Sequence, residues 1–233
     1  MLVVIGGSSG VGLGLLEHFV TGGKNVINGS RSKPEIRNDF LEHAFLDVSD
    51  AESIRQFFDL PSAANIHGLV YCAGVTVRKT KLEDFDRDAF LKLLDVNVAG
   101  FALTMKHAIR RMNPDGCKVV AIGSMATRSI SQYSGFEYTA SKLALSGLVR
   151  HFAQDLASLN ILVNSVHPGP INTPMLRESL ETQEIANIAD NVPTGKLASL
   201  DDINATVDFL LSENNKHING AGIDVNGGQI LTA

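Results

Sequence analysis

The sequence lacks the features that would indicate a membrane, metal-binding or nucleic-acid-binding protein. No apolar run approaches the roughly 20 residues of a membrane-spanning helix. The two cysteines, Cys72 and Cys117, and the seven histidines show no metal-ligand spacing. The net charge is −5, the pI is about 5.8 and there is no Lys/Arg cluster. We therefore expect no membrane, metal or nucleic acid among the partners.

The N-terminus also lacks the pattern of a leader. Met1 runs directly into an apolar strand with no basic region before it, so we predict no signal peptide. Cys72 and Cys117 lie in apolar, strand-like segments, and we expect both to be buried free thiols. Unpaired cysteines suit a reducing compartment, and the cytoplasm is the expected location.

Glycine is abundant near the N-terminus. The stretch GGSSGVGLG places five glycines between Gly6 and Gly14, directly after the apolar run LVVI. Glycine lets the backbone turn tightly and approach a bulky anion. The next segment, VGLGLLEHFVT, has the apolar spacing of a helix, whose N-terminus attracts phosphate. Strand, glycine turn and helix together predict that residues 8–11 contact the pyrophosphate of a dinucleotide.

Apolar strands alternate with helices along the rest of the chain. We expect strands at residues 2–5, 25–29, 43–48, 66–74, 117–124, 161–169 and 221–228. Helices are expected near 11–21, 86–112, 135–159 and 175–191, with another beginning near Ser199. This alternation predicts an α/β fold with a parallel sheet covered on both faces. Without a repeat or linker, residues 1–233 are expected to form one doubly wound Rossmann-type domain, with its ligand at the carboxyl ends of the strands.

Residues after the second and third expected strands bear on nucleotide choice. Ser30 and Arg31 stand where a Rossmann unit that prefers NAD carries an acid. A hydroxyl and a cation suit a 2′-phosphate, and a solvated surface arginine is the alternative. After the third strand, Asp47 is placed to accept a hydrogen bond from the adenine amino group. Alternatively, Ser49 or Asp50 caps the next helix, and the two interpretations are compatible.

A hydroxyl, a phenol and an amine follow the fifth expected strand. Ser124 ends that strand, Tyr138 opens the next helix, and Lys142 lies four residues further on the same helical face. A nearby ammonium group stabilises a phenolate and lowers the tyrosine pKa from its usual value of about 10. Tyr-x-x-x-Lys is a weak motif alone, but its place after Ser124 predicts acid–base chemistry.

These motifs, taken in order, resemble the classical short-chain dehydrogenases/reductases along essentially the whole chain. The segments that match are the glycine turn (Gly6, Gly10, Gly12), Asp47, Ala73-Gly74, Asn97 in DVNVAG, the set Ser124, Tyr138 and Lys142, and PGPINT at 168–173. PTGKLASLDDI and DVNGG resemble later segments of the family. The resemblance implies a seven-stranded parallel sheet and NAD(P)-dependent oxidoreduction.

The resemblance also implies roles for individual residues. Tyr138 would exchange a proton with the substrate oxygen, and Ser124 would hydrogen-bond that oxygen. Lys142 would hold the nicotinamide ribose and lower the Tyr138 pKa, while Asn97 would support a water that links Lys142 to solvent. The expected catalytic residues are thus Asn97, Ser124, Tyr138 and Lys142. The expected cofactor-binding residues are Gly6, Ser8, Ser9, Gly10, Val11, Gly12, Ser30, Arg31, Asp47, Val48, Ala73, Gly74, Asn97, Tyr138, Lys142, Pro168, Gly169, Ile171 and Thr173.

Three departures from the family pattern stand out. Ile5 replaces the threonine before the first glycine, and Tyr71-Cys72 replaces an Asn-Asn pair, so each loses an expected polar contact. The Ser124–Tyr138 spacing is one residue longer than usual, and we expect the extra residue to bulge between them. A site with Met125 in the place of the serine would be crippled.

The predicted function is NADPH-dependent reduction of a ketone to a secondary alcohol, with Tyr138 as general acid. NADP(H) is the preferred cofactor and NAD(H) is possible. The alternatives are an NAD(H)-linked alcohol dehydrogenase and a non-catalytic, cofactor-binding regulatory protein. A small-molecule carbonyl or alcohol is the expected substrate, and a homo-oligomer (tetramer or dimer) is the expected assembly, because the helix at 137–159 carries more apolar side chains than one sheet face needs.

Two stretches are expected to frame the substrate. They are residues 127–136 and a short lid around 174–192, the latter predicted as one amphipathic helix. Met175 and Leu176 would contact the substrate or simply pack. Arg128 and Gln132 would recognise a polar or anionic group or remain solvated.

Overall fold

The computed structural model describes residues 1–79, 81–131, 134–173, 176 and 182–231. All seven strands are parallel and form one sheet in the order β3-β2-β1-β4-β5-β6-β7. The strands are β1 (Leu2–Ile5), β2 (Val26–Ser30), β3 (Leu41–Phe45), β4 (Gly68–Tyr71), β5 (Cys117–Ile122), β6 (Ile161–Pro168) and β7 (Gly222–Val225). The expected α/β fold is confirmed. The strand order reverses between β1 and β4, the position where such sheets bind ligands.

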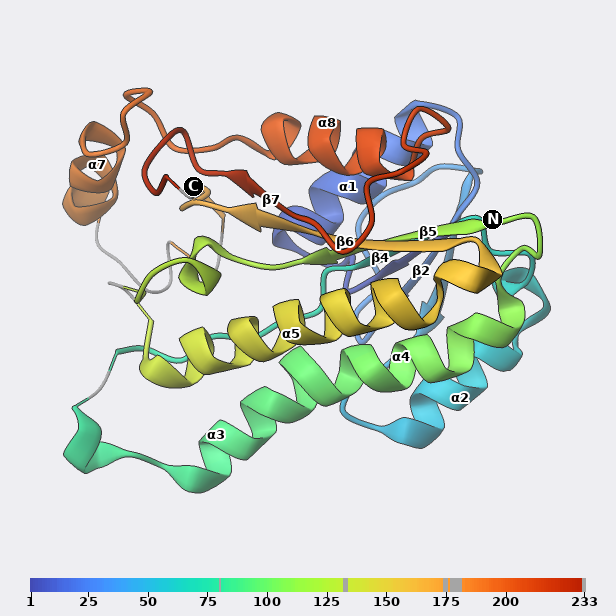
Figure 1. Cartoon of the computed structure of the whole chain (residues 1–233), viewed down its shortest axis with the longest axis horizontal. Coiled ribbons are helices and arrows are strands. Elements are labelled where there is room, and N and C mark those ends of the chain that lie inside the picture. Colours follow the sequence, from blue (N-terminus) through green and yellow to red (C-terminus); the bar gives the residue numbers. More distant parts are fainter. Residues whose placement is uncertain (80, 132–133, 174–175, 177–181, 232–233) are drawn as a thin grey trace.

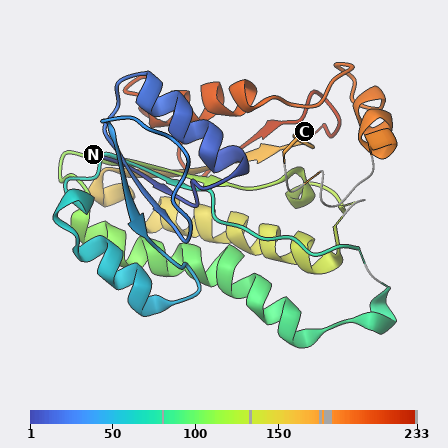
Figure 2. The same ribbon diagram turned by 180° about the vertical axis from the view of Figure 1, so that it is seen from behind.

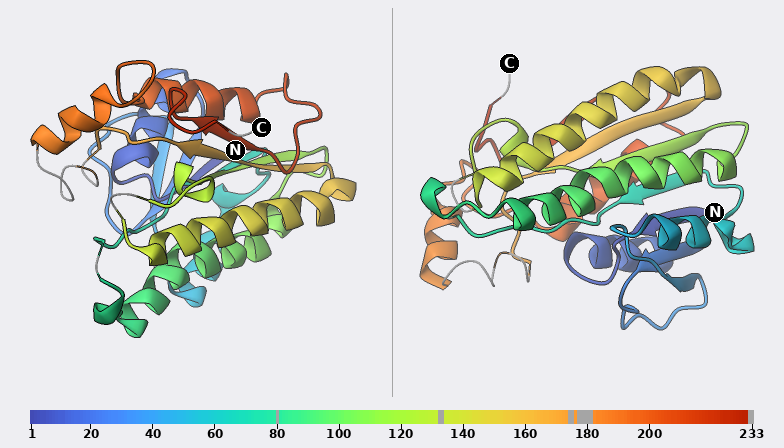
Figure 3. Two further views of the ribbon diagram at one scale, coloured as in Figure 1. Left: turned by 60° about the vertical axis from the view of Figure 1, so that its left-hand side comes forward. Right: turned by 90° about the horizontal axis from the view of Figure 1, so that it is seen from below.

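Helices cover both faces of the sheet (Figures 1 and 2). One layer contains α1 (Gly10–Thr21) and α8 (Leu200–Leu211), and the opposite layer contains α2 (Ala51–Asp59), α4 (Gly100–Ala108) and α5 (Phe136–Asp155). Seen from below, α5 lies beside α3 (Arg87–Leu94) and α4 (Figure 3, right). The short helix α7 (Thr182–Asp190) lies outside both layers (Figure 1).

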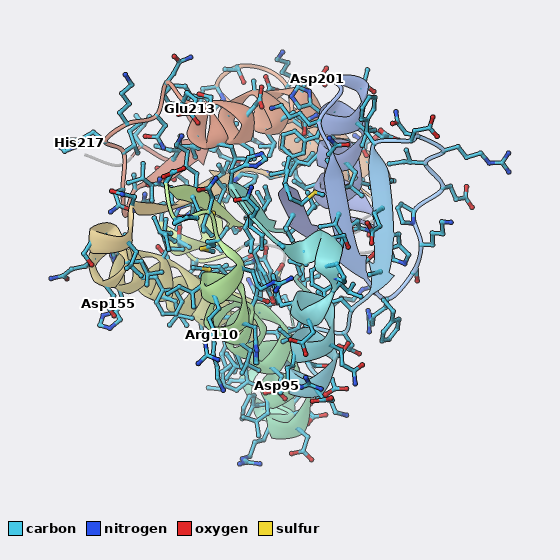
Figure 4. The ribbon with its side chains drawn as sticks, turned by 90° about the vertical axis from the view of Figure 1, so that its right-hand side faces the viewer. Asp95, Arg110, Asp155, Asp201, Glu213 and His217 are labelled. Carbon is cyan, nitrogen blue, oxygen red and sulfur yellow. The ribbon has the colours of Figure 1, made fainter. Side chains whose placement is uncertain are left out.

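The central strands are apolar on both faces because each face has its own core. Val3 and Ile5 of β1 pack with the layer of α2, α4 and α5, whereas Leu2 and Val4 pack with α1 and α8. This two-sided burial explains the continuous apolar run LVVI in the sequence. Charged side chains lie outside these cores: Asp201 lies in the first turn of α8 and Glu213 just after its end, and Arg110 and Asp155 lie on the opposite layer (Figure 4).

Several elements differ in their bounds from the sequence-based expectation, and strand β4, for example, ends at Tyr71 instead of residue 74. Strand β3 ends at Phe45 instead of residue 48, because the chain from Leu46 to Val48 turns toward the nucleotide side of the sheet. The helix expected at 86–112 is not regular: a π-helical turn, Asp95–Ala99, separates α3 from α4, and a 3₁₀ turn covers Ile109–Arg111. Such π turns are rare and frequently mark functional sites.

Helices α1, α5 and α8 begin near the predicted positions, whereas α7 begins at Thr182 within the helix predicted at 175–191, part of which lies outside the described residues. Ser199 caps α8 in a capping box: its hydroxyl accepts a hydrogen bond from the Asp202 amide, and the Asp202 carboxylate accepts one from the Ser199 amide. Within the described ranges, no helix combines the length and the apolar character needed to cross a membrane.

Candidate active site

A cleft of about 500 Å³ runs along the carboxyl ends of the strands. Of the catalytic and cofactor-binding residues expected from the sequence, all except Asn97 line this cleft. Asn97 is buried behind the lining, in the π turn. The structure therefore brings side chains from widely separated segments into one concave site of the size that small molecules and cofactors occupy.

The glycine turn requires glycine at two positions for steric reasons. Gly6 has a φ of +89°, and a Cβ there would lie 2.6 Å from the Ala73 amide nitrogen. A Cβ on Gly12 would lie 2.2 Å from the Gly6 carbonyl oxygen. The N-cap of α1, Ser9, makes no side-chain capping bond, and the first turn of α1 has no acidic residue. The N–H groups at this helix end therefore suit the pyrophosphate of a dinucleotide, and the predicted contact with residues 8–11 stays a prediction.

Replacing Gly12 with alanine is expected to weaken NADPH binding at least about tenfold, because the added methyl group forces the Gly6 backbone out of the turn. Fluorescence titration with NADPH measures the effect. Gly147→Ala is the matched control, since a Cβ at this helical glycine meets no atom within 4 Å. Equal NADPH affinity in the Gly12→Ala variant and the wild type would contradict the assignment of the turn.

The end of β2 is organised by a buried asparagine. The Asn28 Oδ1 accepts a hydrogen bond from the Gly7 amide (3.0 Å), and the Asn28 Nδ2 donates to the Ser30 Oγ (2.8 Å). The Ser30 hydroxyl donates to the Ser32 carbonyl (2.8 Å) and is buried. The Ser30 hydroxyl is thus engaged within the protein, and its expected contact with a 2′-phosphate stays a prediction. Arg31 remains an exposed cation on the cleft lining.

Two interpretations of the turn after β3 were compatible from the sequence: Asp47 contacts the adenine, and Ser49 or Asp50 caps the next helix. Asp50 caps α2, accepting a hydrogen bond from the Glu52 amide (2.9 Å). Asp47 lines the cleft, and its Oδ1 accepts hydrogen bonds from the Ser49 hydroxyl (2.6 Å) and amide (2.9 Å). These hydrogen bonds, with a smaller contribution from Arg31, lower the pKa of Asp47. An ionised carboxylate therefore lies on the nucleotide side of the cleft.

Ser124, Tyr138 and Lys142 lie together at the opposite end of the cleft. Ser124 and Tyr138 both line the cleft, and the Ser124 side chain lies near enough to lower the pKa of Tyr138, so the longer spacing between them does not displace Ser124. The Lys142 Nζ donates to the Ile122 carbonyl (2.9 Å) and lies 5.7 Å from the centre of the Tyr138 ring.

Burial controls the protonation of these groups. It raises the pKa of Tyr138, and the hydrogen bond with Ser124 offsets part of that rise. It lowers the pKa of Lys142 to about 8. The Lys142 ammonium group contacts the Ile122 carbonyl and lies over the Tyr138 ring, and the expectation that it lowers the Tyr138 pKa stays a prediction.

Asn97 connects the π turn with the cleft lining. Its Oδ1 accepts a hydrogen bond from the Val75 amide (2.8 Å), and its Nδ2 donates to the Val75 carbonyl (2.9 Å) and to the Ser141 Oγ (3.0 Å). The Ser141 hydroxyl donates in turn to the Tyr138 carbonyl (2.8 Å). Asn97 therefore fixes both the backbone after β4 and the first turn of α5.

The substrate side differs from expectation at Arg128. Its guanidinium pairs with Asp224 (3.2 Å) and donates to the Gly222 carbonyl (3.0 Å), so it braces β7 instead of facing a substrate. Leu176 lines the cleft, while Gln132 and Met175 lie outside the described residues. Cys72 was expected to be buried, but it is only partly buried and lines the cleft. Across the described ranges, no group of three or more potential ligand side chains could hold a metal.

Sequence reasoning missed several side chains of the site. Thr76, Gln229 and Ile230 line the cleft, and the Gln229 Oε1 is buried with no hydrogen-bond partner among the described residues. Gln229 could have been predicted from the sequence, because it follows the last strand and the carboxyl ends of parallel strands meet at one edge of the sheet. Thr76 follows β4 in the same way.

A buried histidine beside the cleft was also missed. His167 lies near the end of β6, with its Nδ1 2.8 Å from the Thr127 Oγ1 and its Nε2 2.8 Å from the Ser165 Oγ. The Thr127 hydroxyl donates to the Ser124 carbonyl (2.9 Å). Because that hydroxyl proton is used, the His167 Nδ1 must donate to Thr127, and its Nε2 must accept from Ser165. Neutral His167 thereby anchors the turn that carries Ser124.

Comparison with known proteins assigns the chain to a family. A family model described as Enoyl-(Acyl carrier protein) reductase matches residues 9–229. A 3-oxoacyl-(acyl-carrier-protein) reductase, FabG of Salmonella typhimurium, is 30% identical, with 98% of this chain and 96% of the relative covered. A short chain dehydrogenase family protein from Francisella tularensis superimposes with a TM-score of 0.90 at 26% identity, covering 98% of this chain and 97% of the other.

A second solved structure, ElxO with NADP bound, has a TM-score of 0.88 at 26% identity, and the match covers 97% of each chain. These similarities cover nearly the whole chain. The chain therefore belongs to the short-chain dehydrogenase/reductase family, whose members are NAD(P)-binding oxidoreductases that act on CH–OH or carbonyl groups.

Proposed function

We propose that this protein reduces a ketone to a secondary alcohol with NADPH, and that Tyr138 is the general acid. The observation that carries the proposal is the cleft itself, in which the partly buried Tyr138 lies together with Ser124, Lys142 and the glycine turn. The side chains of Tyr138 and Ser124 both line the cleft, and we expect their hydroxyls to contact the same substrate oxygen. When bound, the nicotinamide supplies the hydride.

The protein's own groups supply the proton and the orientation. Burial raises the pKa of Tyr138, so the phenol carries its proton at neutral pH, as a general acid requires for carbonyl reduction. Ser124 donates a hydrogen bond to the substrate oxygen as negative charge develops there. Lys142, with a pKa lowered to about 8, is placed beneath the Tyr138 ring to exchange protons and to hold the nicotinamide ribose.

The preference for NADPH rests on Arg31. It is an exposed cation on the cleft lining at the end of β2, with no acid at that strand end to accept a ribose hydroxyl. A guanidinium group binds phosphate through paired, charge-assisted hydrogen bonds. Because the Ser30 hydroxyl is engaged with Ser32, we assign the 2′-phosphate to Arg31 and not to Ser30.

Titration of the purified protein with NADPH and with NADH, followed by a screen of carbonyl compounds, tests the proposal. NADPH is expected to bind tighter, and Arg31→Ala to weaken it about tenfold while changing NADH affinity less than about twofold. Arg37→Ala is the matched control, since it removes the same charge from the same exposed loop outside the cleft. Preference for NADH would favour an alcohol dehydrogenase, and absence of turnover would overturn the proposed activity.

We further propose that residues 1–233 act as one cofactor-binding domain, in a homo-oligomer within the cytoplasm. Two observations support this. Leu143 and Leu159, on and just after α5, and Phe209 on α8 are roughly half exposed, as expected of a surface that a second subunit covers. Both cysteines are free thiols, as a reducing compartment allows.

A further inference from the structure

Tyr71 occupies an unusual position at the end of β4. Its side chain is fully buried, and its hydroxyl donates a hydrogen bond to the Val96 carbonyl (2.6 Å) inside the π turn. The ring packs against Phe101 of α4, with 5.2 Å between the ring centres. Burial raises the pKa of the phenol well above its usual range, so the hydroxyl remains a donor.

Gly100, directly after the π turn, packs so closely against Tyr71 and Val48 that no side chain fits at position 100. A Cβ on Gly100, which follows the turn, would lie 2.6 Å from the Tyr71 Oη and 2.8 Å from the Val48 carbonyl oxygen. The Gly100 amide bonds to the Asp95 carbonyl, five residues back, instead of to Val96. Asp95 lies on the outer side of the turn and is exposed (Figure 4). The contacts that fix the π turn are therefore those of Val96 and Asn97, on the side that faces β4.

The inner side of the turn is connected to the cleft at two points. The Tyr71 hydroxyl donates a hydrogen bond to the Val96 carbonyl. Asn97, which follows Val96 in the turn, forms hydrogen bonds with the amide and the carbonyl of Val75. Between these two points lies the segment Cys72–Gly74, which lines the cleft. A change at the Val96 carbonyl therefore acts on Asn97 directly and reaches Tyr138 through the hydroxyl of Ser141.

We infer that Tyr71 is a positioning residue for Asn97: its hydroxyl fixes the π turn so that Asn97 holds the cleft lining after β4 and the first turn of α5. The inference rests on the proposed oxidoreductase function for its catalytic consequence but not for its structural one. In Tyr71→Phe the ring and its packing on Phe101 remain, and only the hydrogen bond to Val96 is lost.

The test compares Tyr71→Phe with Thr104→Val, which removes another fully buried hydroxyl. Thr104 lies on α4, soon after the π turn, and its hydroxyl has no hydrogen-bond partner among the described residues. In the cofactor-free protein, Tyr71→Phe is expected to speed amide exchange in peptides covering residues 72–76 and 95–101, with peptides of β5 and β6 unchanged. In turnover, kcat is expected to fall about tenfold with little change in KM. Thr104→Val is expected to match the wild type in both measurements.

The outcomes separate the two proposals. A wild-type protein without turnover would overturn the proposed function, while the exchange comparison would still test Tyr71. Exchange and kcat in Tyr71→Phe equal to the wild type would overturn the inference about Tyr71. Faster exchange spread uniformly over β5 and β6 would also overturn it, because that pattern indicates a general loss of stability.

Discussion

Replacing Tyr138 with phenylalanine is expected to lower kcat by about 10²- to 10⁴-fold while leaving NADPH affinity nearly unchanged, because general acid catalysis contributes that much. The substitution removes one oxygen and keeps the ring that fills the cleft wall. Reduction then requires a proton from water, while the Ser124 hydroxyl keeps the hydrogen bond that it accepts from the Ala126 amide. Steady-state kinetics and a fluorescence titration with NADPH measure the two effects separately.

The control for this experiment is Ser146→Ala. It removes a hydroxyl from the same helix two turns further on, and Ser146 does not line the cleft. Turnover of the control should equal that of the wild type. If Tyr138→Phe retained wild-type kcat, the proton would have to come from another group, and the assignment of Tyr138 as general acid would be wrong.

The sequence predicted the parts of this protein that depend on local rules. Continuous apolar runs, a glycine turn and an ordered set of polar residues were enough for the sheet, the helix layers and the cleft. The strand bounds were less accurate, as at β3, because the chain at Leu46–Val48 serves the cleft instead of the sheet. Periodicity describes burial, and it carries no information about where a buried strand stops pairing.

The remaining features depend on contacts between distant residues, which no local pattern contains. The π turn follows from the fit of Gly100 against Tyr71 and Val48, each far away in the sequence. Arg128 faces β7 because it pairs with Asp224, which lies 96 residues further along the chain. Ser30 faces inward because its hydroxyl accepts a hydrogen bond from Asn28, which also bonds to the amide of Gly7 in the glycine turn. The sequence identifies the residue types at the site, whereas the structure decides which of their polar atoms remain available to a ligand.

The buried His167 is expected to make the free energy of unfolding fall as the pH falls, well before the carboxylates protonate. The side chain is 1% exposed, and burial lowers the pKa of His167 to about 4 from 6.5. The charges that face it act in both directions, since Arg128 and Lys142 lower this pKa and Asp224 raises it. Glycines at 123 and 222 pack against the ring, so it cannot turn toward solvent.

The sign follows from linkage between protonation and folding. Between about pH 6.5 and pH 4 the unfolded chain binds a proton at residue 167 and the folded chain does not, so the free energy of unfolding falls as the pH falls. A shift of this size corresponds to about 3 kcal/mol, fully present above pH 6.5 and progressively lost toward pH 4. Protonation of the Nε2 would also remove the acceptor for the Ser165 hydroxyl, loosening the contacts that hold the Ser124 turn.

Urea unfolding of the wild type, His167→Asn and His217→Asn between pH 4 and 8 isolates this contribution. His167→Asn should be less stable at pH 7.5 but should lose stability less steeply toward pH 4, because its amide can bond to Thr127 without titrating. His217 is exposed at the edge of the molecule (Figure 4) and does not line the cleft, so its variant serves as the matched control and should follow the wild-type curve. His43 and His67, whose pKa values are also lowered, remain in all three proteins and cancel in the comparison. Equal slopes of unfolding free energy against pH for the wild type and His167→Asn would show that His167 is protonated as readily in the folded as in the unfolded protein. That result would contradict the proposal that a neutral, buried His167 anchors the turn that carries Ser124.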